Sequence, residues 1–342
     1  MSKMFKKARL TKLKSPVFVT GAAGFIGRRL VNYLLEIDVE VVAFDIIACP
    51  EALADSSSLR WVKGDVTDYE DVFQAMSGVK TVFHLAAMVG DWGAADLHRR
   101  VTVDGTDNVF RAGQEGGENP TVVLASSIVV YGQQIGEGTC HEGCSLGNTF
   151  GPYSESKQAQ EKLAQAYLQK GLDVRIVRPA NVYGAGSKPW VEELCRELKR
   201  GVPALIGGGD FNAGLVHVDN VVDILVRVAR ASGQAGQVFN AGEEEVVTWK
   251  QYTGDLAKLI GAPRPRSLPF FVASSMSLAL ENSYRLFGVT SRPPLTQEAL
   301  NLVGSAHDIS MKKTVAVLGF RPLVSYREGL NEVQHYMHAS AD

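Results

Sequence analysis

The sequence has few cysteines, little net charge and no apolar run of transmembrane length. Four cysteines among 342 residues are too few for a disulfide framework, so we expect a reducing, cytoplasmic location. The formal net charge of −2 gives no field that would attract nucleic acid or an anionic membrane. The expected partner is therefore a small molecule.

The most apolar stretch, Leu268–Leu280, is interrupted by serines and falls short of the ~20 residues of a membrane span. We predict a buried helix or a lid there. The first fourteen residues carry six basic side chains and no acidic one, without the apolar core of a signal peptide. Residues 1–15 are therefore predicted to be a flexible arm. Whether either segment touches a membrane surface peripherally stays open at this stage.

The sequence does have a large apolar content, 45% of residues, in a repeating order of strands and helices. Short Val- and Phe-rich runs, typical of strands buried on both faces, alternate with helical stretches. The predicted strands are Val17–Thr20, Val39–Phe44, Thr81–Leu85, Thr121–Ala125 and Val174–Val177, and the predicted helices are Phe25–Glu36, Asp68–Met76, Ala95–Glu115 and Tyr153–Gln169. This order predicts an α/β fold, a Rossmann-type doubly wound parallel sheet.

A glycine-rich loop follows the first predicted strand directly. Its sequence, TGAAGFIG over 20–27, has the spacing G-x-x-G-x-x-G and opens a helix. Glycines there permit a tight turn, a close approach of a pyrophosphate to the backbone and close packing of helix on strand. The helix N-terminus would face the phosphates. We assign to the cofactor site Gly21, Gly24, Phe25, Ile26 and Gly27.

Acidic residues at the ends of the next strands indicate which dinucleotide is bound. Asp45 ends the second strand, 24 residues after Gly21, near the interval expected for the acid that binds the adenosine ribose. A carboxylate there would repel the 2′-phosphate of NADP, which favours NAD, although Arg28 and Arg29 are cations nearby. Asp65 and Val66, after the third strand, are predicted to border the adenine.

The regular alternation ends near Pro179, where glycine-rich turns begin. Further helices are predicted at Trp190–Lys199, Val221–Ala231 and Trp249–Ile260. We expect residues 16–181 to form the NAD-binding domain, with segments around 214–240 returning to it. Residues 182–213 and 241–335 would form a smaller, mixed substrate-binding portion.

Three residues form a predicted catalytic set. Tyr153 and Lys157 stand four residues apart, on one face of a helix, and an ammonium at ~4 Å would lower the pKa of a phenol toward neutrality. Ser127 follows the strand Thr121–Ala125, at the edge where ligands bind in open α/β sheets. Ser127 would hydrogen bond a substrate oxygen, Tyr153 would exchange its proton, and the nicotinamide would exchange hydride with the carbon.

Six motifs together resemble the extended short-chain dehydrogenase/reductase family, within the NAD-dependent epimerase/dehydratase superfamily. They are TGAAGFIG (20–27), HLAA (84–87), SSIVVYG (126–132), YSESK (153–157), RPANVYG (178–184) and HVDNVVD (217–223). The resemblance implies that Lys157 also holds the nicotinamide ribose. It implies further cofactor contacts from Leu85, Ala86, Ala87, Pro179, Asn181 and Val182. It also implies a homodimer, formed through the helix of Tyr153 and its neighbour. One departure is Thr102, where the family often has asparagine.

Two positions argue against the sugar-modifying branches of this family. Ala213 stands where nucleotide-sugar epimerases usually have an arginine that clamps a diphosphate, and Ile128-Val129 stand where sugar dehydratases place an Asp-Glu pair. The residues expected around the substrate are instead mostly apolar. They are Met88, Val89, Trp92, Ile128, Val129, Asn181, Trp190 and Leu215.

The remaining resemblance is to the 3β-hydroxysteroid-dehydrogenase-like and ketoreductase branch, through AAMVGDWG (86–93), RPPLT (292–296) and LGFRP (318–322). The leading hypothesis is an NAD(H)-dependent oxidoreductase that interconverts a secondary alcohol and a ketone on an apolar substrate, such as a steroid or a β-keto or hydroxy acid. The alternatives are a nucleotide-sugar 4-epimerase with tightly bound NAD and a non-catalytic NAD-dependent regulatory protein.

No metal site is predicted. Cys140 and Cys144 flank a histidine, but no second ligand pair follows at zinc-finger spacing, so residues 140–144 are predicted to be a surface loop. His84 and His217 lie at the ends of strands and are predicted to be structural.

Overall fold

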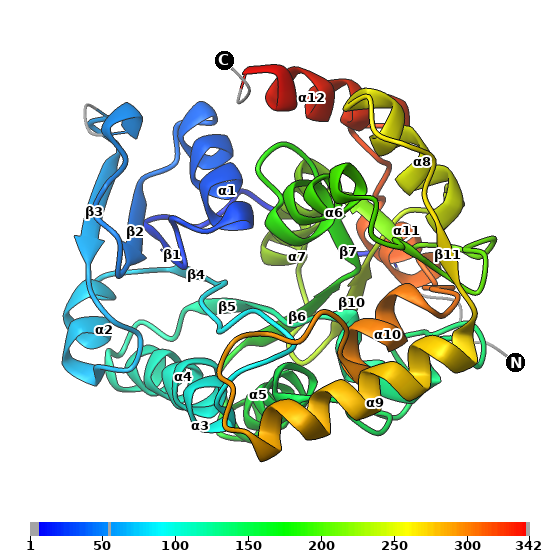
Figure 1. Ribbon diagram of the computed structural model, residues 1–342. Helices are drawn as coiled ribbons and strands as arrows, with labels where there is room; N and C mark the ends of the chain where they lie inside the picture. Colours follow the sequence, from blue (N-terminus) through cyan, green and yellow to red (C-terminus); the bar gives the residue numbers. More distant parts are fainter. Residues whose placement is uncertain (1–6, 54–55, 340–342) are drawn as a thin grey trace, which may run out of the picture.

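The computed structural model describes residues 7–53 and 56–339, built around one parallel sheet (Figure 1). Within these residues the sheet has seven strands in the order β10-β6-β5-β4-β1-β2-β3. They are β1 (Val17–Thr20), β2 (Val41–Asp45), β3 (Leu59–Lys63), β4 (Thr81–His84), β5 (Thr121–Ala125), β6 (Val174–Pro179) and β10 (Val238–Ala241). The strand order reverses between β1 and β4, which creates the crevice where doubly wound sheets bind ligands. The predicted fold is confirmed.

Helices cover both faces of the sheet, and its strands other than β3 are mostly buried on both faces. In β1, Val17 and Val19 pack into one core cluster while Phe18 packs into the other, as the alternation of side chains along a strand requires. The first cluster includes α1 (Phe25–Glu36), α7 (Val218–Arg230) and α11 (Lys312–Leu318). The second includes α2 (Tyr69–Ala75), α4 (Gly105–Glu115) and α5 (Pro152–Gln169).

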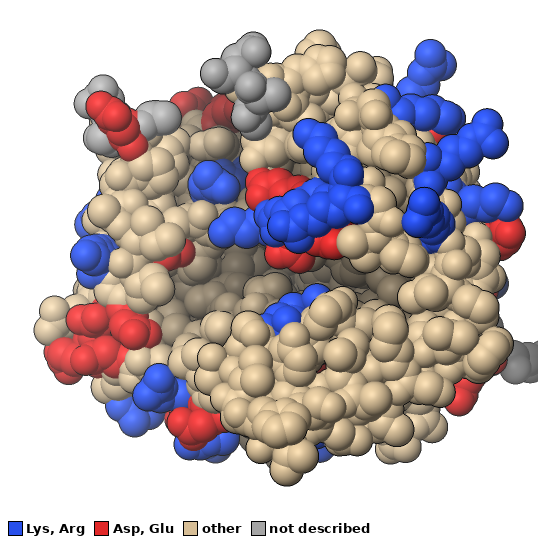
Figure 2. Space-filling view, viewed as in Figure 1, with Lys and Arg blue, Asp and Glu red and all other residues tan. Residues whose placement is uncertain are grey.

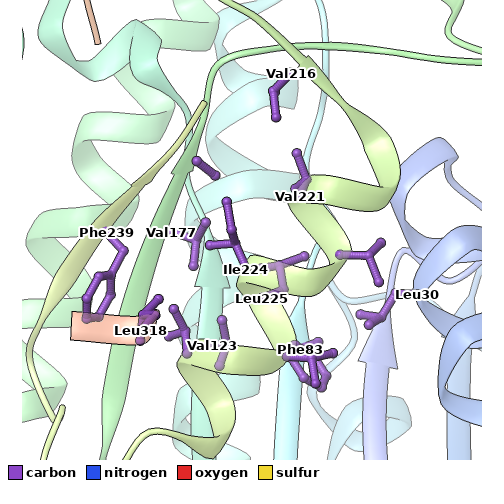
Figure 3. Close-up of a cluster of buried hydrophobic side chains, with 14 of the residues drawn as sticks. Leu30, Phe83, Val123, Val177, Val216, Val221, Ile224, Leu225, Phe239 and Leu318 are labelled. Carbon is purple, nitrogen blue, oxygen red and sulfur yellow. The ribbon is translucent and has the colours of Figure 1, made fainter. Parts of the chain in front are cut away.

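The core between the sheet and α7 is closely packed (Figure 3). Ile224 and Leu225 of α7 lie against Val123 and Val177 of the sheet, and all four side chains are buried. Burial of a side chain of this size stabilises the fold by about 1.5–3 kcal/mol. This packing fixes the sheet whose carboxyl edge carries the predicted site.

Residues after β6 build a second, smaller set of elements over that edge. β7 (Asn181–Tyr183) pairs with β9 (Leu215–His217), and β8 (Leu205–Ile206) pairs with β11 (Ser267–Leu268). A ring cluster of Tyr183, Tyr252 and Tyr326 lies at its centre. Its helices are α6 (Leu194–Arg200), α8 (Trp249–Leu259), α9 (Phe270–Leu286), α10 (Gln297–Val303) and α12 (Tyr326–Ala339).

Irregular helical segments lie beside the crevice. The stretch predicted as one helix over Ala95–Glu115 is α3 (Ala95–His98), a π-helical segment over Arg99–Asp104, and α4. At the end of this segment the Thr106 hydroxyl donates to the Thr102 carbonyl at 2.5 Å. Further short helical segments are Glu51–Leu53, Ile128–Gln134 and the π-helical Lys188–Glu193.

Two expectations need correction, one for the amino-terminal arm and one for the burial of the stretch Leu268–Leu280. Residues 1–6 lie outside the described residues, but the rest of the predicted arm packs onto the fold: Leu13 is buried in the main core, and the Ala8 amide donates to the Val317 carbonyl at 2.8 Å. The apolar stretch Leu268–Leu280 does form a helix, α9, yet most of its side chains are exposed rather than buried. None of the helices described is long and apolar enough to cross a membrane.

A substitution at Gly27 would test how tightly α1 packs on the glycine-rich loop. A β-carbon at Gly27 would lie 2.0 Å from the Gly21 carbonyl oxygen, so Gly27→Ala should lower the free energy of unfolding by roughly 1–3 kcal/mol. Urea denaturation followed by circular dichroism measures the change. The matched control is Gly254→Ala in α8, where the added carbon meets no atom within 4 Å and should stabilise the helix by up to about 1 kcal/mol. Equal stability of wild type and Gly27→Ala would contradict this packing.

Candidate active site

The predicted site residues gather at the carboxyl edge of the sheet because parallel strands all end there. Figure 2 shows a hollow across this face of the molecule, with Lys and Arg side chains along its upper rim, over α6. The predicted residues follow six strands: Gly21–Gly27 after β1, Asp45 at the end of β2, Asp65-Val66 after β3, Leu85–Ala87 after β4, Ser127 after β5 and Pro179–Val182 at β6 and β7. The sheet thus brings together segments that are far apart in the sequence.

The glycine-rich loop leaves room for a phosphate at the start of α1. Gly21 has φ +67°, and a β-carbon there would lie 2.9 Å from the Ala86 amide nitrogen. At Gly24 the nearest atom to an added β-carbon is the Gly21 oxygen, at 3.1 Å. Among the described residues, no side chain caps the N-terminus of α1 and no acid lies in its first turn. The exposed amide dipoles of this turn therefore fit a pyrophosphate.

Asp45 is fixed beside that loop by backbone amides. Its Oδ2 accepts from the Ala23 amide at 2.9 Å and its Oδ1 from the Ile47 amide at 3.0 Å. Each carboxylate oxygen can still accept another hydrogen bond, which suits the two hydroxyls of a ribose. Arg28 and Arg29 are the two cations that could favour the 2′-phosphate of NADP. Arg29 is already paired with the carboxylates of Asp219 and Glu332.

Tyr153, Lys157 and Ser127 come together where α5 packs on the end of β5. Ser127 caps the helical turn that follows the strand, accepting from the Val129 amide at 3.3 Å. The Ser127 hydroxyl also lies near enough to Tyr153 to lower the pKa of its phenol. Lys157 is 3% exposed, and its Nζ donates to the Ala125 carbonyl at 2.7 Å and to Gln160 Oε1 at 3.0 Å. The spacing of four residues therefore does place both side chains on the face that meets the sheet.

The pKa values of these groups differ from the expectation that Lys157 lowers that of Tyr153. Burial raises the pKa of Tyr153 to about 12; the hydrogen bond from Ser127 opposes this shift and the charge of Glu298 adds to it. Burial lowers the pKa of Lys157 to about 7, against the opposing charge of Glu161. The reason is the direction of the ammonium, which points to the Ala125 carbonyl rather than to the phenol. Tyr153 is therefore protonated at neutral pH.

A buried polar network that the sequence did not predict connects the glycine-rich loop to Lys157. His84 bonds to the Thr20 hydroxyl at 2.7 Å and to the Thr106 hydroxyl at 2.8 Å, and Gln160 Nε2 donates to Thr106 at 2.7 Å. Burial, followed by the charge of Lys157, lowers the pKa of His84 to about 3. The histidine is thus neutral and structural, as predicted, and it ties β1, β4, α4 and α5 into one unit.

A second feature missed from the sequence is a carboxyl group against the start of α5. Glu298 of α10 is 2% exposed; its Oε1 accepts from the Ser154 amide at 3.2 Å and its Oε2 lies 3.3 Å from the Ser154 hydroxyl. Burial, with the nearby charge of Asp91, raises the pKa of Glu298 to about 8. Asp91 itself accepts from Arg292 and from the Thr296 hydroxyl. These contacts join the carboxyl-terminal segment to the helix that carries Tyr153.

The predicted substrate residues after β4 and β5 lie on both sides of the catalytic set. Met88 and Trp92 are half-buried, and Val89 is 67% exposed. Ile128 and Val129, directly after Ser127, are buried. The Met88 amide donates to the Thr102 hydroxyl at 3.0 Å, so the threonine that departs from the family pattern holds this segment in place.

The predicted substrate residues of the smaller unit pack mainly with one another. Trp190 stacks on Trp249 with ring centroids 5.5 Å apart, and Leu215 is buried in the same cluster. The Asn181 side chain donates to the Ala213 carbonyl at 2.7 Å. An open depression of about 430 Å³ beside α9 and α10 is lined by other residues, among them Phe150, Phe211 and Phe270.

His217 and Cys140 have local partners. His217 caps α7 and bonds to Glu332 at 2.8 Å, as expected of a structural histidine. His217, Asp219 and Glu332 offer ligand atoms within 4.8 Å of one another, but the Arg29 guanidinium lies against both carboxylates. In the predicted loop, Cys140 is buried and its thiol donates to the Gln134 carbonyl at 3.6 Å.

Comparisons with known proteins agree with this arrangement. The chain matches the NAD dependent epimerase/dehydratase family over residues 17–242. A 2-alkyl-3-oxoalkanoate reductase from Stenotrophomonas maltophilia is 28% identical over 93% of this chain and 98% of that protein. A 3-beta-hydroxysteroid dehydrogenase from Mycolicibacterium neoaurum is 28% identical over 94% of this chain and 90% of that protein.

Solved structures show the same fold with NAD bound. MoeE5 in complex with UDP-glucose and NAD has a TM-score of 0.75 and 28% identity, covering 96% of this chain and 100% of that chain. The dTDP-glucose 4,6-dehydratase DesIV of Streptomyces venezuelae, a double mutant with NAD bound, has a TM-score of 0.77 and 26% identity, covering 95% and 97%. The chain belongs to the NAD dependent epimerase/dehydratase family and is an NAD-dependent enzyme.

Proposed function

We propose that this enzyme is an NAD(H)-dependent oxidoreductase that interconverts a secondary alcohol and a ketone on an apolar substrate without a nucleotide. The observation that carries the proposal is that the Ser127 hydroxyl lies near enough to Tyr153 to lower the pKa of its phenol, one helical turn from the buried Lys157. A proton donor and a second hydrogen-bonding hydroxyl at one point are what a carbonyl oxygen needs during hydride transfer. We therefore assign the catalytic roles to Ser127, Tyr153 and Lys157.

In the direction of reduction, the chain's residues act on the substrate oxygen. Bound NADH supplies the hydride that the carbonyl carbon accepts. The Ser127 hydroxyl orients and polarises the C=O group, and Tyr153 transfers its phenolic proton to the oxygen as negative charge develops there. Because Tyr153 has a pKa of about 12, it holds this proton at neutral pH, which favours ketone reduction. Lys157, whose Nζ donates to the Ala125 carbonyl, is assigned to hold the nicotinamide ribose one helical turn from Tyr153.

Several features support an apolar substrate over a sugar nucleotide. Ala213 offers no cation for a diphosphate, and its carbonyl is already bonded to Asn181. Ile128 and Val129 are buried after Ser127 and supply no acidic pair of the kind that sugar dehydratases have there. Relatives over almost the whole chain are named as acting on 3-oxoalkanoates and 3-beta-hydroxysteroids. A nucleotide-sugar 4-epimerase is the second candidate, supported by solved relatives that hold UDP-glucose.

The remaining cofactor contacts, the location and the oligomeric state are also proposals. The residues that we assign to NAD lie at or after the ends of the strands. They are Gly21, Gly24, Phe25, Ile26, Gly27, Asp45, Asp65, Val66, Leu85, Ala86, Ala87, Pro179, Asn181 and Val182. All four cysteines are free, which suits a cytoplasmic enzyme. We further infer a homodimer through α4 and α5, whose light-scattering mass would be twice that of the chain.

Replacing Tyr153 with phenylalanine removes the proton donor and keeps the ring. Tyr153→Phe should lower kcat by at least about a hundredfold while NAD binding is retained. The measurement is NADH absorbance during reaction with steroid ketones, β-keto acids and UDP-sugars, with calorimetry for NAD binding. Tyr131→Phe, at a buried tyrosine bonded to Asn240, is the control for loss of a phenol elsewhere. Sugar epimerisation without net NADH change would move the assignment to the second candidate.

Replacing Glu298 with glutamine should shift the pH profile of alcohol oxidation toward lower pH. The carboxylate ionises near pH 8 and its charge raises the pKa of Tyr153, so a neutral amide lets Tyr153 lose its proton at lower pH. We expect the rising limb of kcat/KM to move by roughly half a unit to one unit. Glu281→Gln, another buried carboxyl whose partner is Gln297, should leave the profile in place. A shift to higher pH would contradict the assignment.

Replacing Asp45 with asparagine should weaken discrimination between the two dinucleotides. The amide removes the negative charge that repels a 2′-phosphate and one of the acceptors for the ribose hydroxyls, so the preference for NAD over NADP should fall at least about tenfold. The ratio of kcat/KM for NADH and NADPH measures it. The control is Asp65→Asn, after the next strand, which should change kcat/KM for NADH and for NADPH by the same factor. An unchanged ratio in Asp45→Asn would place the ribose elsewhere.

A further inference from the structure

The surface of α9 has its apolar side facing outward. Seventeen large hydrophobic residues are exposed in the part of the chain that the structure describes, and eight of them lie within 270–289. The most exposed are Phe271 (73%), Leu286 (79%) and Phe287 (77%). A cluster of this kind on one helix marks a surface for interaction. The eight are Phe270, Phe271, Val272, Met276, Leu278, Leu286, Phe287 and Val289.

The inner side of α9 is polar and is anchored, so the exposed face is not a displaced core. Ser277 and Glu281 are buried. The Gln297 amide donates to Glu281 Oε1 at 2.7 Å, and Gln297 Nε2 donates to the Ser277 hydroxyl at 2.5 Å. Turning the helix to bury its phenylalanines would break these hydrogen bonds, and Ser277 and Glu281 would gain no new protein partner in their place. The bonds to α10 thus hold the apolar face outward.

The charges around α9 are almost all positive. Between residues 261 and 292 the one acidic residue is Glu281, and its side chain is 8% exposed. Arg264 and Arg266 are exposed before the helix, and Arg285 is exposed in its last turn. Figure 2 shows the surface over α9 as a broad uncharged area. An apolar face flanked by Arg264, Arg266 and Arg285, with no exposed acid within residues 261–292, is complementary to anionic lipid headgroups above an acyl layer.

We propose that α9 and the following residues to Val289 dock on an anionic phospholipid surface. Phe271, Leu286 and Phe287 insert at the boundary of headgroups and acyl chains, and Arg264 and Arg266 lie at the phosphates. A second copy of the chain fits this face less well, because pairing two copies of α9 brings arginines of like charge together without an exposed acid.

The docking surface is connected to the candidate active site. The Trp92 ring packs edge-on against Tyr284 of α9 at 6.2 Å, and the Arg285 guanidinium lies 5.6 Å from the Trp92 ring centre. Trp92 belongs to the segment after β4 that we assign to the substrate, so lipid contact places the rim of the site at the membrane surface. This connection rests on the proposed function, whereas lipid binding itself does not.

Vesicle flotation of the full chain tests the docking. Wild type should bind vesicles of equal parts phosphatidylcholine and phosphatidylglycerol, more weakly in high salt and more weakly to phosphatidylcholine alone. The triple variant Phe271→Ser/Leu286→Ser/Phe287→Ser should lose at least about a hundredfold in partition coefficient. The matched control is Val202→Ser/Val246→Ser/Leu323→Ser, at exposed apolar residues outside this surface, and it should bind like wild type. The double variant Arg264→Gln/Arg266→Gln should weaken binding to the vesicles that contain phosphatidylglycerol and leave binding to pure phosphatidylcholine vesicles unchanged.

Three results would overturn the docking. One is the absence of wild-type binding to anionic vesicles, and another is an equal loss in both triple variants. The third is a concentration-dependent dimer that the α9 variant abolishes while vesicles bind no protein, because a second copy would then cover this face. Circular dichroism and NAD binding verify that each variant is folded. Turnover of a water-soluble ketone should be unchanged in the α9 variant, so failure of the proposed function and failure of the docking give different results.

Discussion

The hydrogen bond from Lys157 to the Ala125 carbonyl is the interaction on which the site depends. It joins the second turn of α5 to the end of β5. Tyr153, one turn earlier in the helix, is thereby set beside Ser127, which follows β5. A buried ammonium is costly unless it is hydrogen bonded, and Gln160, Thr106 and His84 continue the network behind it. The position of the phenol is therefore determined by a chain of buried polar contacts that extends back to the glycine-rich loop.

Much of the fold and the first half of the site followed from the sequence, because their signals are local. Buried strands, the glycine spacing and the pair Tyr153 and Lys157 are each visible within a few residues, and the rule that parallel strands end at one edge combines them. The direction of the pKa shift of Tyr153 did not follow. Spacing predicts that an ammonium is near a phenol, but the orientation of its Nζ depends on which carbonyl is in reach, and that is a tertiary property.

The carboxyl-terminal contribution could not be predicted for the same reason. Glu298 is 144 residues from the Ser154 amide that it binds, and nothing near it in the sequence indicates that partner. The helix α9 was predicted from its apolar composition, but its exposure was not. An apolar stretch is expected to be buried when the surface of a protein faces only water. The bonds from Gln297 to Ser277 and Glu281 decide the orientation of the helix, and they involve residues that look incidental in the sequence.

The two halves of the molecule thus have different physical constraints. The sheet half holds the Tyr153 phenol, the Ser127 hydroxyl and the Lys157 ammonium close to one another. It does so with a buried network in which Lys157, Gln160, Thr106 and His84 are hydrogen bonded. The carboxyl-terminal half reaches that site through a few long-range contacts, Glu298 to Ser154 and Arg292 to Asp91. Because these contacts are few, we expect changes on the outer surface of α9 to leave the predicted catalytic set undisturbed. The apolar, arginine-flanked surface of α9 lies in the carboxyl-terminal half, where few contacts link it to the predicted catalytic set.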